Sequence, residues 1–523
     1  MDSRNERPEL EPISPKPDIG ETQPLLDRSP PTSNTTESQS STKLLSTRHA
    51  FSILVSLQIG SGIFASPAQV DSNVPSPGAA LLVWVAGGLL SWTGAASFAE
   101  LGASLPLNGG MQEYLRYIYG DTMAFLMSWI YIMAVKPSSM AIQSIVIAES
   151  IASVLGGPTP AAEWVLKLMA ITALFSMVLI NSINTKTTMR LNESFAVIKM
   201  ATVALVVAGG LTAFLAHLIN SKTSLSGSKD WFTRNWFQSR PTVSEGHTID
   251  WSKLGAWDML GHYSAALYAG LWAYDGWDNA NFVASEIRDP GRSLPRAIKA
   301  AMTVVLSCFE LVNVAYYILL PWDTLSANDA VAVSAAKSLL GRRGGILITI
   351  LVAISCAGSI TSNLFSVGRL TVAAAQRHYL PAFLSGRGFP TSKKTDNTDL
   401  VSDNESSVPK TPPKIIFDAP LPANVLGLFL TSLYILLGSF HTLLLFVGMA
   451  EWVFYVSTVV GLLVLRRREP SLDRPFKPNI VVPGVFVVVG TLVIARSAVF
   501  APVQSLVLGS LLGIGGLVGW VRR

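Results

Sequence analysis

The sequence predicts an all-α membrane protein with twelve transmembrane helices, the first and sixth of which are broken near the middle of the bilayer. Half of its residues are hydrophobic and only 14% are charged, whereas charged residues make up about 25% of soluble domains. The mean hydropathy is +0.42. Apolar segments of about 20 residues, the length that crosses a bilayer, recur from residue 50 to the C-terminal end. These observations argue against a water-soluble protein.

Twelve apolar segments are the expected spans, and Pro and Gly punctuate most of their connections. Residues 1–47 are rich in Pro, Ser and Thr and predict a disordered cytosolic tail without a cleaved signal peptide. Residues 48–523 form the expected twelve-helix domain, in which the polar segment 386–414 predicts a flexible cytosolic insertion. The expected spans cover residues 49–70, 79–104, 122–153, 163–182, 193–218, 257–285, 297–320, 344–376, 422–439, 443–465, 480–499 and 503–521.

The positive charges fall mainly on one side of the expected spans. Twenty Lys and Arg residues lie in one set of alternate loops and at the C-terminal end, eight lie in the opposite loops, and six more precede the first span. Since cytosolic loops carry the excess of Lys and Arg, both termini are predicted to be cytosolic. This distribution explains the net charge of +5 without a nucleic-acid partner. Three cations within residues 337–343 oppose the pattern.

Two glycine-containing interruptions lie near the middle of expected spans. The first span contains Gly60-Ser61-Gly62 and the sixth contains Asp275-Gly276. Glycine weakens a helix, and free backbone groups are tolerated at that depth only around a protein cavity. Interruptions five spans apart are typical of inverted five-helix repeats with a midplane site. Half-helices that begin and end at breaks offer N–H groups to a carboxylate and carbonyls to an ammonium, which suits a zwitterionic amino acid. The alternative is that the glycines only permit close helix packing.

Several ordered blocks of the sequence carry a family resemblance. They are Ile59-Gly-Ser-Gly-Ile-Phe64, Phe98-Ala-Glu-Leu-Gly102, Pro137-Ser-Ser139, Tyr268-Ala-Gly-Leu-Trp-Ala-Tyr-Asp-Gly-Trp277, Asn281-Phe-Val283, Pro290-Gly-Arg-Ser-Leu-Pro-Arg-Ala-Ile298 and Arg466-Arg-Arg-Glu-Pro470. These blocks resemble the L-type amino acid transporter family, which belongs to the amino acid–polyamine–organocation superfamily and has the LeuT fold. The similarity runs from about residue 49 to 521.

The resemblance implies a secondary transporter that moves amino acids by alternating access. It implies that the backbone of Ser61, Gly62 and Ile63 binds the substrate carboxylate. The amine would meet backbone carbonyls of the two breaks, the Trp272 ring would gate the substrate, and Trp452 would line the pocket. The expected substrate-binding residues are Gln58, Ser61, Gly62, Ile63, Trp272, Asp275, Asn279 and Trp452.

Charged residues within expected spans need a reason, because each costs about 2.5–3.5 kcal/mol at the centre of a span. By resemblance, Lys199 occupies the position where sodium-coupled relatives bind an ion, and would brace the first span against the eighth. Asp275 is a candidate for binding a substrate ammonium or a cationic side chain, for pairing with an internal lysine, or for relaying a proton, with a local hydrogen-bonding cap as the alternative. Glu451 is a candidate for proton coupling, since a buried carboxylate tends to hold a proton, with a structural hydrogen bond as the alternative. Lys136 is expected to anchor helix packing.

The sequence departs from the animal members of the family in one respect. Those members form a disulfide with a glycoprotein heavy chain through a cysteine between helices 3 and 4, whereas residues 155–162 contain none. A disulfide-linked heavy chain is therefore not expected, and the stand-alone fungal branch that includes methionine permeases is the better match. The expected substrates are large neutral amino acids such as methionine, with cationic ones as further candidates, and the expected coupling is proton symport or exchange.

Other functions and locations follow less well from the sequence. A non-transporting amino acid sensor on the same fold is the main alternative, although the 47-residue tail is short for such a receptor. No metal-ligand cluster or catalytic motif suggests an enzyme or a cofactor, and no filter repeat suggests a channel. The expected location is the plasma membrane, with a vacuolar or endosomal membrane as the alternative.

Overall fold

The computed structural model defines the arrangement of most of the expected helical domain. Residues 43–523 form one compact unit, which contains every described residue. The described residues are 45–107, 109–155, 162–183, 185–220, 227–244, 247–327, 330–386 and 420–522. Most of the expected tail, most of the expected insertion and the loop residues 156–161 lie outside these ranges. Leu45 is buried and pairs with Ile287 in a parallel bridge.

The described part of the chain is an all-α membrane protein, as the sequence predicts. Nine of its helices are long and apolar enough to cross a membrane, and the bent pair α1 (Thr47–Gln58) and α2 (Gly62–Ser72) makes a tenth. The two remaining expected spans coincide with α10 (Ala256–Ala273) and the 17-residue α14 (Leu421–Leu437). The number twelve stays a prediction. The nine are α3 (Pro77–Ser104), α5 (Asp121–Ile130) continued by α6 (Lys136–Leu155), α7 (Glu163–Ile183), α8 (Thr185–Ile219), α11 (Pro290–Leu319), α13 (Val331–Gln376), α15 (Phe440–Arg468), α16 (Val481–Phe500) and α17 (Pro502–Val521).

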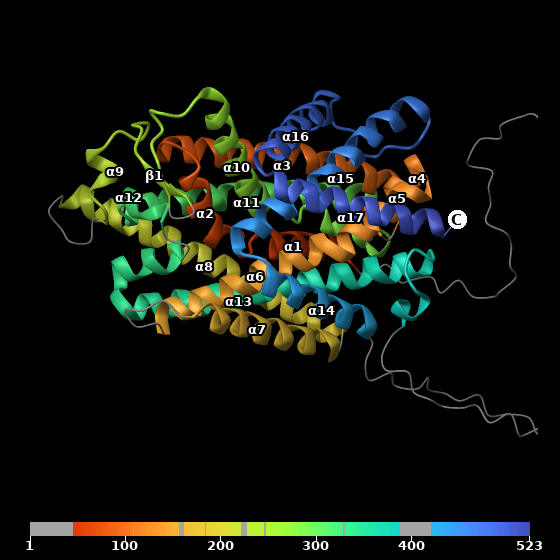
Figure 1. Cartoon of the computed structure of the whole chain (residues 1–523), viewed down its shortest axis with the longest axis horizontal. Helices are drawn as coiled ribbons and strands as arrows, with labels where there is room; N and C mark the ends of the chain where they lie inside the picture. Colours follow the sequence, from red (N-terminus) through yellow and green to blue (C-terminus); the bar gives the residue numbers. More distant parts are fainter. Residues whose placement is uncertain are drawn as a thin grey trace, which may run out of the picture. The chain divides into compact units, whose positions relative to one another are not determined.

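Short elements cover the two ends of the helical bundle. Near one end lie α9 (Asp230–Thr233), α12 (Trp322–Leu325) and a hairpin of β1 (Thr242–Ser244) and β2 (His247–Ile249). In the hairpin, Thr242 pairs with Ile249 in an antiparallel register. The helix α4 (Met111–Tyr119) and the C-terminal end of α17 lie at the opposite end (Figure 1). Short 3₁₀ turns cover Asn279–Phe282, Ala284–Glu286 and Ala382–Ser385.

A widened turn joins α5 to α6 and follows from a proline. Residues Tyr131–Val135 form a π-helix directly before Lys136 and Pro137. Proline has no N–H and cannot bond the carbonyl one turn earlier. The carbonyl of Met133, four residues before Pro137, instead accepts the hydroxyl hydrogen of Tyr434 at 3.3 Å.

The three cations that oppose the charge pattern lie around a kink in α13. Gly341 has φ 60° and ψ −154° and separates two helical parts within Val331–Gln376. A positive φ of this kind costs glycine little. Lys337 donates to the carbonyl of Ser153 near the end of α6, at 2.9 Å. The expected span 344–376 is thus preceded by a further helical segment, and Lys337 of this segment contacts the end of α6.

Candidate functional site

The first break lies between α1 and α2, whose axes meet at 44°. Ile59 N–H donates to the carbonyl of Val55, and Gly60 N–H donates to that of Gln58, both at 2.9 Å. No backbone carbonyl of the described residues accepts a hydrogen bond from the N–H groups of residues 61–63. The first N–H groups of a helix have no partner within it. The break therefore presents N–H groups at the positive end of α2.

The glycines of this break allow two neighbouring helices to approach closely. A Cβ atom on Gly62 would lie 2.5 Å from the Cα atom of Ala273 in α10. A Cβ atom on Gly60 would lie 2.5 Å from Ser359 Oγ in α13. Both distances are too short for any side chain. Close packing and a broken helix, which the sequence left as alternatives, therefore occur together.

The second break follows the last turn of α10. Asp275 N–H donates to the carbonyl of Trp272 at 3.1 Å, and Gly276 then adopts a φ of +104°. Two 3₁₀ turns follow, and the next α-helix begins only at Pro290. The expected sixth span, 257–285, is therefore not two α-helical halves. Its second half is irregular, because the positive φ at Gly276 ends the helix and the following residues form only i to i+3 turns.

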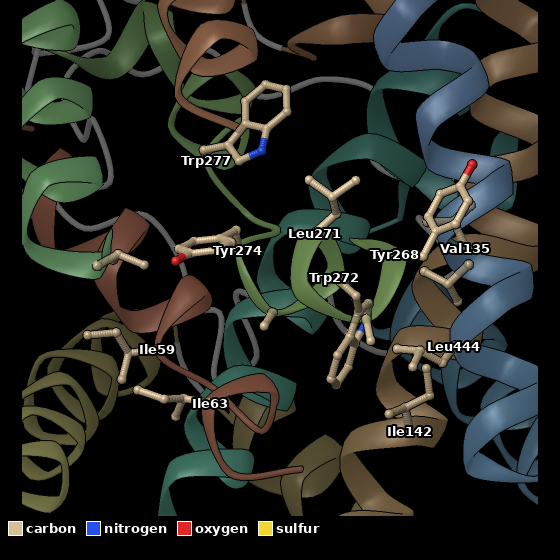
Figure 2. Close-up of a cluster of buried hydrophobic side chains, with 14 of the residues drawn as sticks. Ile59, Ile63, Val135, Ile142, Tyr268, Leu271, Trp272, Tyr274, Trp277 and Leu444 are labelled. Carbon is tan, nitrogen blue, oxygen red and sulfur yellow. The ribbon is translucent and has the colours of Figure 1, made fainter. Parts of the chain in front are cut away.

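Both breaks line one cavity between the helices. The space open to the centre of a water molecule is about 20 Å³, enough for about one water. Figure 2 shows the Trp272 side chain between the segment that carries Ile63 and the helices that carry Ile142 and Leu444. An amino acid needs more room, so its binding requires a movement of the lining. The cavity is lined by Leu57, Gln58, Gly60, Ser61, Gly62, Ser139, Gln143, Trp272, Ala273, Asp275 and Asn363.

Two of the expected residues bring polar side chains to the cavity. The amide nitrogen and oxygen of Gln58 are buried, and neither has a hydrogen-bond partner among the described residues. Asp275 Oδ1 accepts the hydroxyl hydrogen of Tyr455 at 2.7 Å. Because an unpaired buried amide is costly, Gln58 is suited to bind a molecule that enters the cavity. The hydrogen bond from α15 fixes the carboxylate of Asp275.

Three cavity residues with polar side chains were missed by the sequence reasoning. Ser139 and Gln143 lie one turn apart on α6, and Asn363 lies on α13. Asn363 Nδ2 donates to Gln143 Oε1 at 3.4 Å. A search for amides within apolar spans would have found both Gln143 and Asn363, since such groups at that depth need a partner.

Three expected substrate-binding residues do not line this cavity. Asn279 lines a neighbouring cavity with His49 and Glu193. Its side-chain nitrogen donates to Gly276 O and Asp278 Oδ1 beside the second break. Trp452 stacks on Phe486 of α16 with ring centroids 5.1 Å apart, so its ring lies in a helix interface. The side chain of Ile63 is fully buried in the hydrophobic core.

Lys199 lies between the first break and α13. It is fully buried, and its Nζ donates to the carbonyl of Ser56 and, at 2.8 Å, to Ser359 Oγ. Ser56 belongs to the last turn of α1, and Ser359 belongs to α13. The ammonium thus joins the two helices that meet behind the first break.

A second buried lysine lies near Asp275. Lys136 Nζ is 3.8 Å from Glu451 Oε1, and both side chains are at most 2% exposed. Neither of these two atoms has a partner at hydrogen-bond distance among the described residues. Asp275 and Asp278 also act electrostatically on Lys136. This charged cluster of Lys136, Glu451, Asp275 and Asp278 connects α6, α15 and the second break, and it includes the expected packing lysine.

Comparison with known proteins gives the family. A model of the family described as "Amino acid permease" matches residues 45–517. The chain belongs to this family. The permease is 29% identical over 484 residues to the b(0,+)-type amino acid transporter 1 of Mus musculus, covering 90% of this chain and 88% of the relative. It is 28% identical to the cystine/glutamate transporter of Homo sapiens, covering 83% of this chain and 76% of the relative. It is also 28% identical to the Asc-type amino acid transporter 1 of Rattus norvegicus, covering 87% of this chain and 76% of the relative.

The family and the fold together establish the general function. The described helices make the permease a multi-pass membrane protein, and the family match covers both breaks. Its function is amino acid transport across a membrane. The fungal branch expected from the sequence stays a prediction.

Proposed function

We propose that this permease binds the backbone end of its amino acid substrate at the cavity between the two breaks. The carboxylate would meet the N–H groups of residues 61–63, because these lack backbone acceptors at the positive end of α2. The ammonium would meet the carbonyl oxygens at the ends of α1 and α10 and the Asp275 carboxylate, which lines the same cavity. The observation that carries the proposal is that both helix ends open into one cavity.

Asp275 would decide which side chains accompany that backbone. Its carboxylate lies where it can attract a cationic group, yet Tyr455 already holds one of its oxygens. Large neutral amino acids such as methionine are the proposed substrates, with cationic amino acids accepted through the free carboxylate oxygen. The b(0,+)-type and Asc-type relatives are named as amino acid transporters.

Uptake into cells that lack competing carriers tests this site. Labelled methionine, leucine, arginine and cystine are compared in the wild type and in Asp275→Gly, which should change the ranking of the four. Gly62→Leu should abolish uptake while the protein still reaches the membrane, because a Cβ would collide with Ala273. Gly484→Leu, in open surroundings on α16, is the control. An unchanged ranking would show that Asp275 does not select among substrate side chains. If the wild type takes up no amino acid, the sensor alternative is favoured.

We further propose that the permease couples uptake to protons through its charged cluster. One ammonium, Lys136, faces the three carboxyl groups of Glu451, Asp275 and Asp278. Ionised charges are costly in the bilayer interior unless they are balanced, so a proton bound within the cluster brings it closer to neutrality. Release of that proton would change the electrostatic interactions of Asp275 within the cluster, and Asp275 lines the cavity. Lys199 already fills the space next to the first break, which argues against sodium coupling.

A comparison of net uptake with exchange tests the coupling. Glu451→Gln should lose accumulation driven by a proton gradient but keep exchange of labelled for unlabelled substrate, since an amide cannot carry the proton. Glu310→Gln, which removes a carboxyl group from α11 outside the cluster, is the matched control. Accumulation at the wild-type level in Glu451→Gln would falsify the coupling role.

Orientation, location and partners complete the proposal. The charge pattern supports cytosolic termini, and the plasma membrane is the proposed location, with a vacuolar or endosomal membrane as the alternative. Both cysteines lie within long helices, Cys308 in α11 and Cys356 in α13, so neither is placed for an external disulfide. Surface biotinylation followed by a non-reducing gel tests location and partner. A band shifted by a disulfide-linked partner contradicts this part of the proposal. That the permease has no enzymatic activity stays a prediction.

A further inference from the structure

Three arginines from separate parts of the chain converge on a hollow at the end of the bundle that holds α4 and the end of α17. Arg116 comes from the last turn of α4, Arg377 follows α13, and Arg522 follows α17. The hollow measures about 490 Å³, within the range of about 300–1,000 Å³ that small-molecule sites occupy. Its other lining residues are Asp121, Thr122, Phe125, Gln376, His378, Tyr379 and Gly519.

The acidic groups nearby offset only part of this positive charge. Glu113 is almost fully buried and binds both Arg116, at 2.9 Å, and Arg377, at 3.1 Å. Asp121 Oδ1 accepts the hydroxyl hydrogen of Tyr379 at 2.7 Å. Arg522 donates to the carbonyl of Tyr379 and has no carboxylate within ion-pair distance among the described residues. Three guanidinium groups therefore face two carboxylates, and the excess is positive.

We propose that this hollow binds a phosphate group, as carried by the headgroup of an anionic phospholipid. Guanidinium groups bind phosphate oxygens through paired hydrogen bonds. The N-terminal turn of α5, which includes Asp121 and Thr122, also borders the hollow. On the proposed orientation the site lies on the cytosolic side, where anionic lipids collect and basic pockets between helices bind their headgroups.

Helix capping and the positive-inside pattern explain single arginines at these places, but they do not explain the hollow. Cations near helix C-termini interact favourably with the dipole without any enclosed space. Here the arginines border a space that the chain leaves unfilled and that α4, α5, α13 and α17 surround. Only 11% of the apolar 18-residue stretch of α17 is buried inside the protein, which is the lowest share among the nine spans found in the described residues. A bound headgroup would join this weakly packed helix to α4 and α13.

Native mass spectrometry of the purified full-length permease measures the binding. The probe is phosphatidic acid, whose headgroup is a bare phosphate monoester, against a background of phosphatidylcholine. Arg377→Gln and Arg522→Gln should each weaken phosphatidic acid binding about fivefold, and the double variant should weaken it further. Arg467→Gln removes the same charge from an exposed position at the end of α15 and should leave binding unchanged.

The variants separate a built site from diffuse attraction, and a competition arm identifies the source of the phosphate. Because Arg377 also holds Glu113, Arg522→Gln keeps the test informative if the Arg377 variant folds poorly. Equal weakening by Arg467→Gln, or wild-type binding in the double variant, overturns the site. If inorganic phosphate displaces phosphatidic acid only when it is present in large excess, the lipid headgroup is supported as the ligand. If inorganic phosphate displaces the lipid at an equal concentration, the hollow is still a phosphate site, but the lipid is overturned as its ligand.

Discussion

Two ion pairs on opposite sides of the central cavity differ greatly in burial. At the end proposed to face outward, Arg240 and Asp71 lie 2.5 Å apart with side chains 2% and 0% exposed. The neighbouring cavity lined by Asn279, His49 and Glu193 is called the inner cavity, because it lies on the side proposed to face the cytosol. There, His49 and Glu193 lie 3.8 Å apart with side chains 47% and 56% exposed. Exposed pairs contribute about 0–1 kcal/mol, whereas removing one partner of a buried pair costs about 3–5 kcal/mol. The Arg240–Asp71 pair therefore holds its surroundings together more firmly than the His49–Glu193 pair does.

The outer closure, formed by Asp71, Arg240, Tyr317 and Trp322, ties the end of α2 to its surroundings. Tyr317 of α11 donates its hydroxyl hydrogen to Asp71 Oδ1 at 2.6 Å. Arg240, from the segment between α9 and β1, also donates to the carbonyl of Trp322 at 2.7 Å. Movement of α2 away from α11 would break the hydrogen bond between Tyr317 and Asp71 and would separate Asp71 from Arg240, which remains bound to Trp322. Among the described residues that line the inner cavity, His49 and Glu193 form an exposed ion pair, so movement of these two residues apart requires less disruption.

The largest expected effect comes from removing the cation of the outer closure. Arg240→Ala leaves Asp71 buried without its charge partner, which should destabilise the closed outer end by about 3–5 kcal/mol. A cysteine at Ser66 of α2, buried in this structure, should then react at least about 100-fold faster with an impermeant maleimide added outside. The same reaction in the chain with only Cys308 and Cys356 gives the background.

Arg234→Ala is the matched control for this experiment. Arg234 lies in the same external segment and pairs with Asp323, whose side chain is 66% exposed. An exposed pair contributes little, so labelling should stay near the wild-type rate. If Arg234→Ala and Arg240→Ala label equally, burial does not determine how much an ion pair contributes to closure, and the comparison fails.

Local sequence patterns predicted the helices and breaks but not the closures. Gly60-Ser61-Gly62 and Asp275-Gly276 identified both breaks, because glycine and polar residues within apolar spans are local signals. The partners Arg240 and Asp71 are 169 residues apart. Neither their pairing nor the approach of Lys136 to Glu451 is encoded in any window of the sequence, since each depends on how distant spans pack.

The cavity shows the same division between local and distant information. Gln58, Ser61, Trp272 and Asp275 lie at the breaks, were expected from the family resemblance, and line the cavity. Trp452 was placed there by family resemblance, yet its ring packs on α16 in this structure. Which face of a helix meets the cavity depends on helix rotation, and residue spacing along an almost uniformly apolar span does not determine it.

A medium effect is expected from the hydroxyl group of the outer closure. Tyr317→Phe removes one hydrogen bond to the Asp71 carboxylate but leaves Arg240 in place. Hydrogen bonds to charged groups contribute about 1.5–3 kcal/mol. Labelling of the cysteine at Ser66 should therefore rise about tenfold. Tyr316→Phe is the control, because the buried Tyr316 hydroxyl has no partner among the described residues. A larger rise in Tyr316→Phe would contradict the assignment.

The smallest expected effect lies at the inner end. Glu193→Gln removes the acidic partner of His49, but both side chains face solvent and the pair is long. Inner access should change by no more than about fivefold, measured as labelling of a cysteine at Ser362 from the cytosolic side in inside-out vesicles. Ser362 and Leu57 line the inner cavity, and Leu57 also lines the cavity at the breaks. If Glu193→Gln changes labelling as strongly as Arg240→Ala, the inner pair is a true counterpart of the outer closure. A small change would instead leave Leu57, the side chain shared by both cavities, as the barrier that must move for inward release.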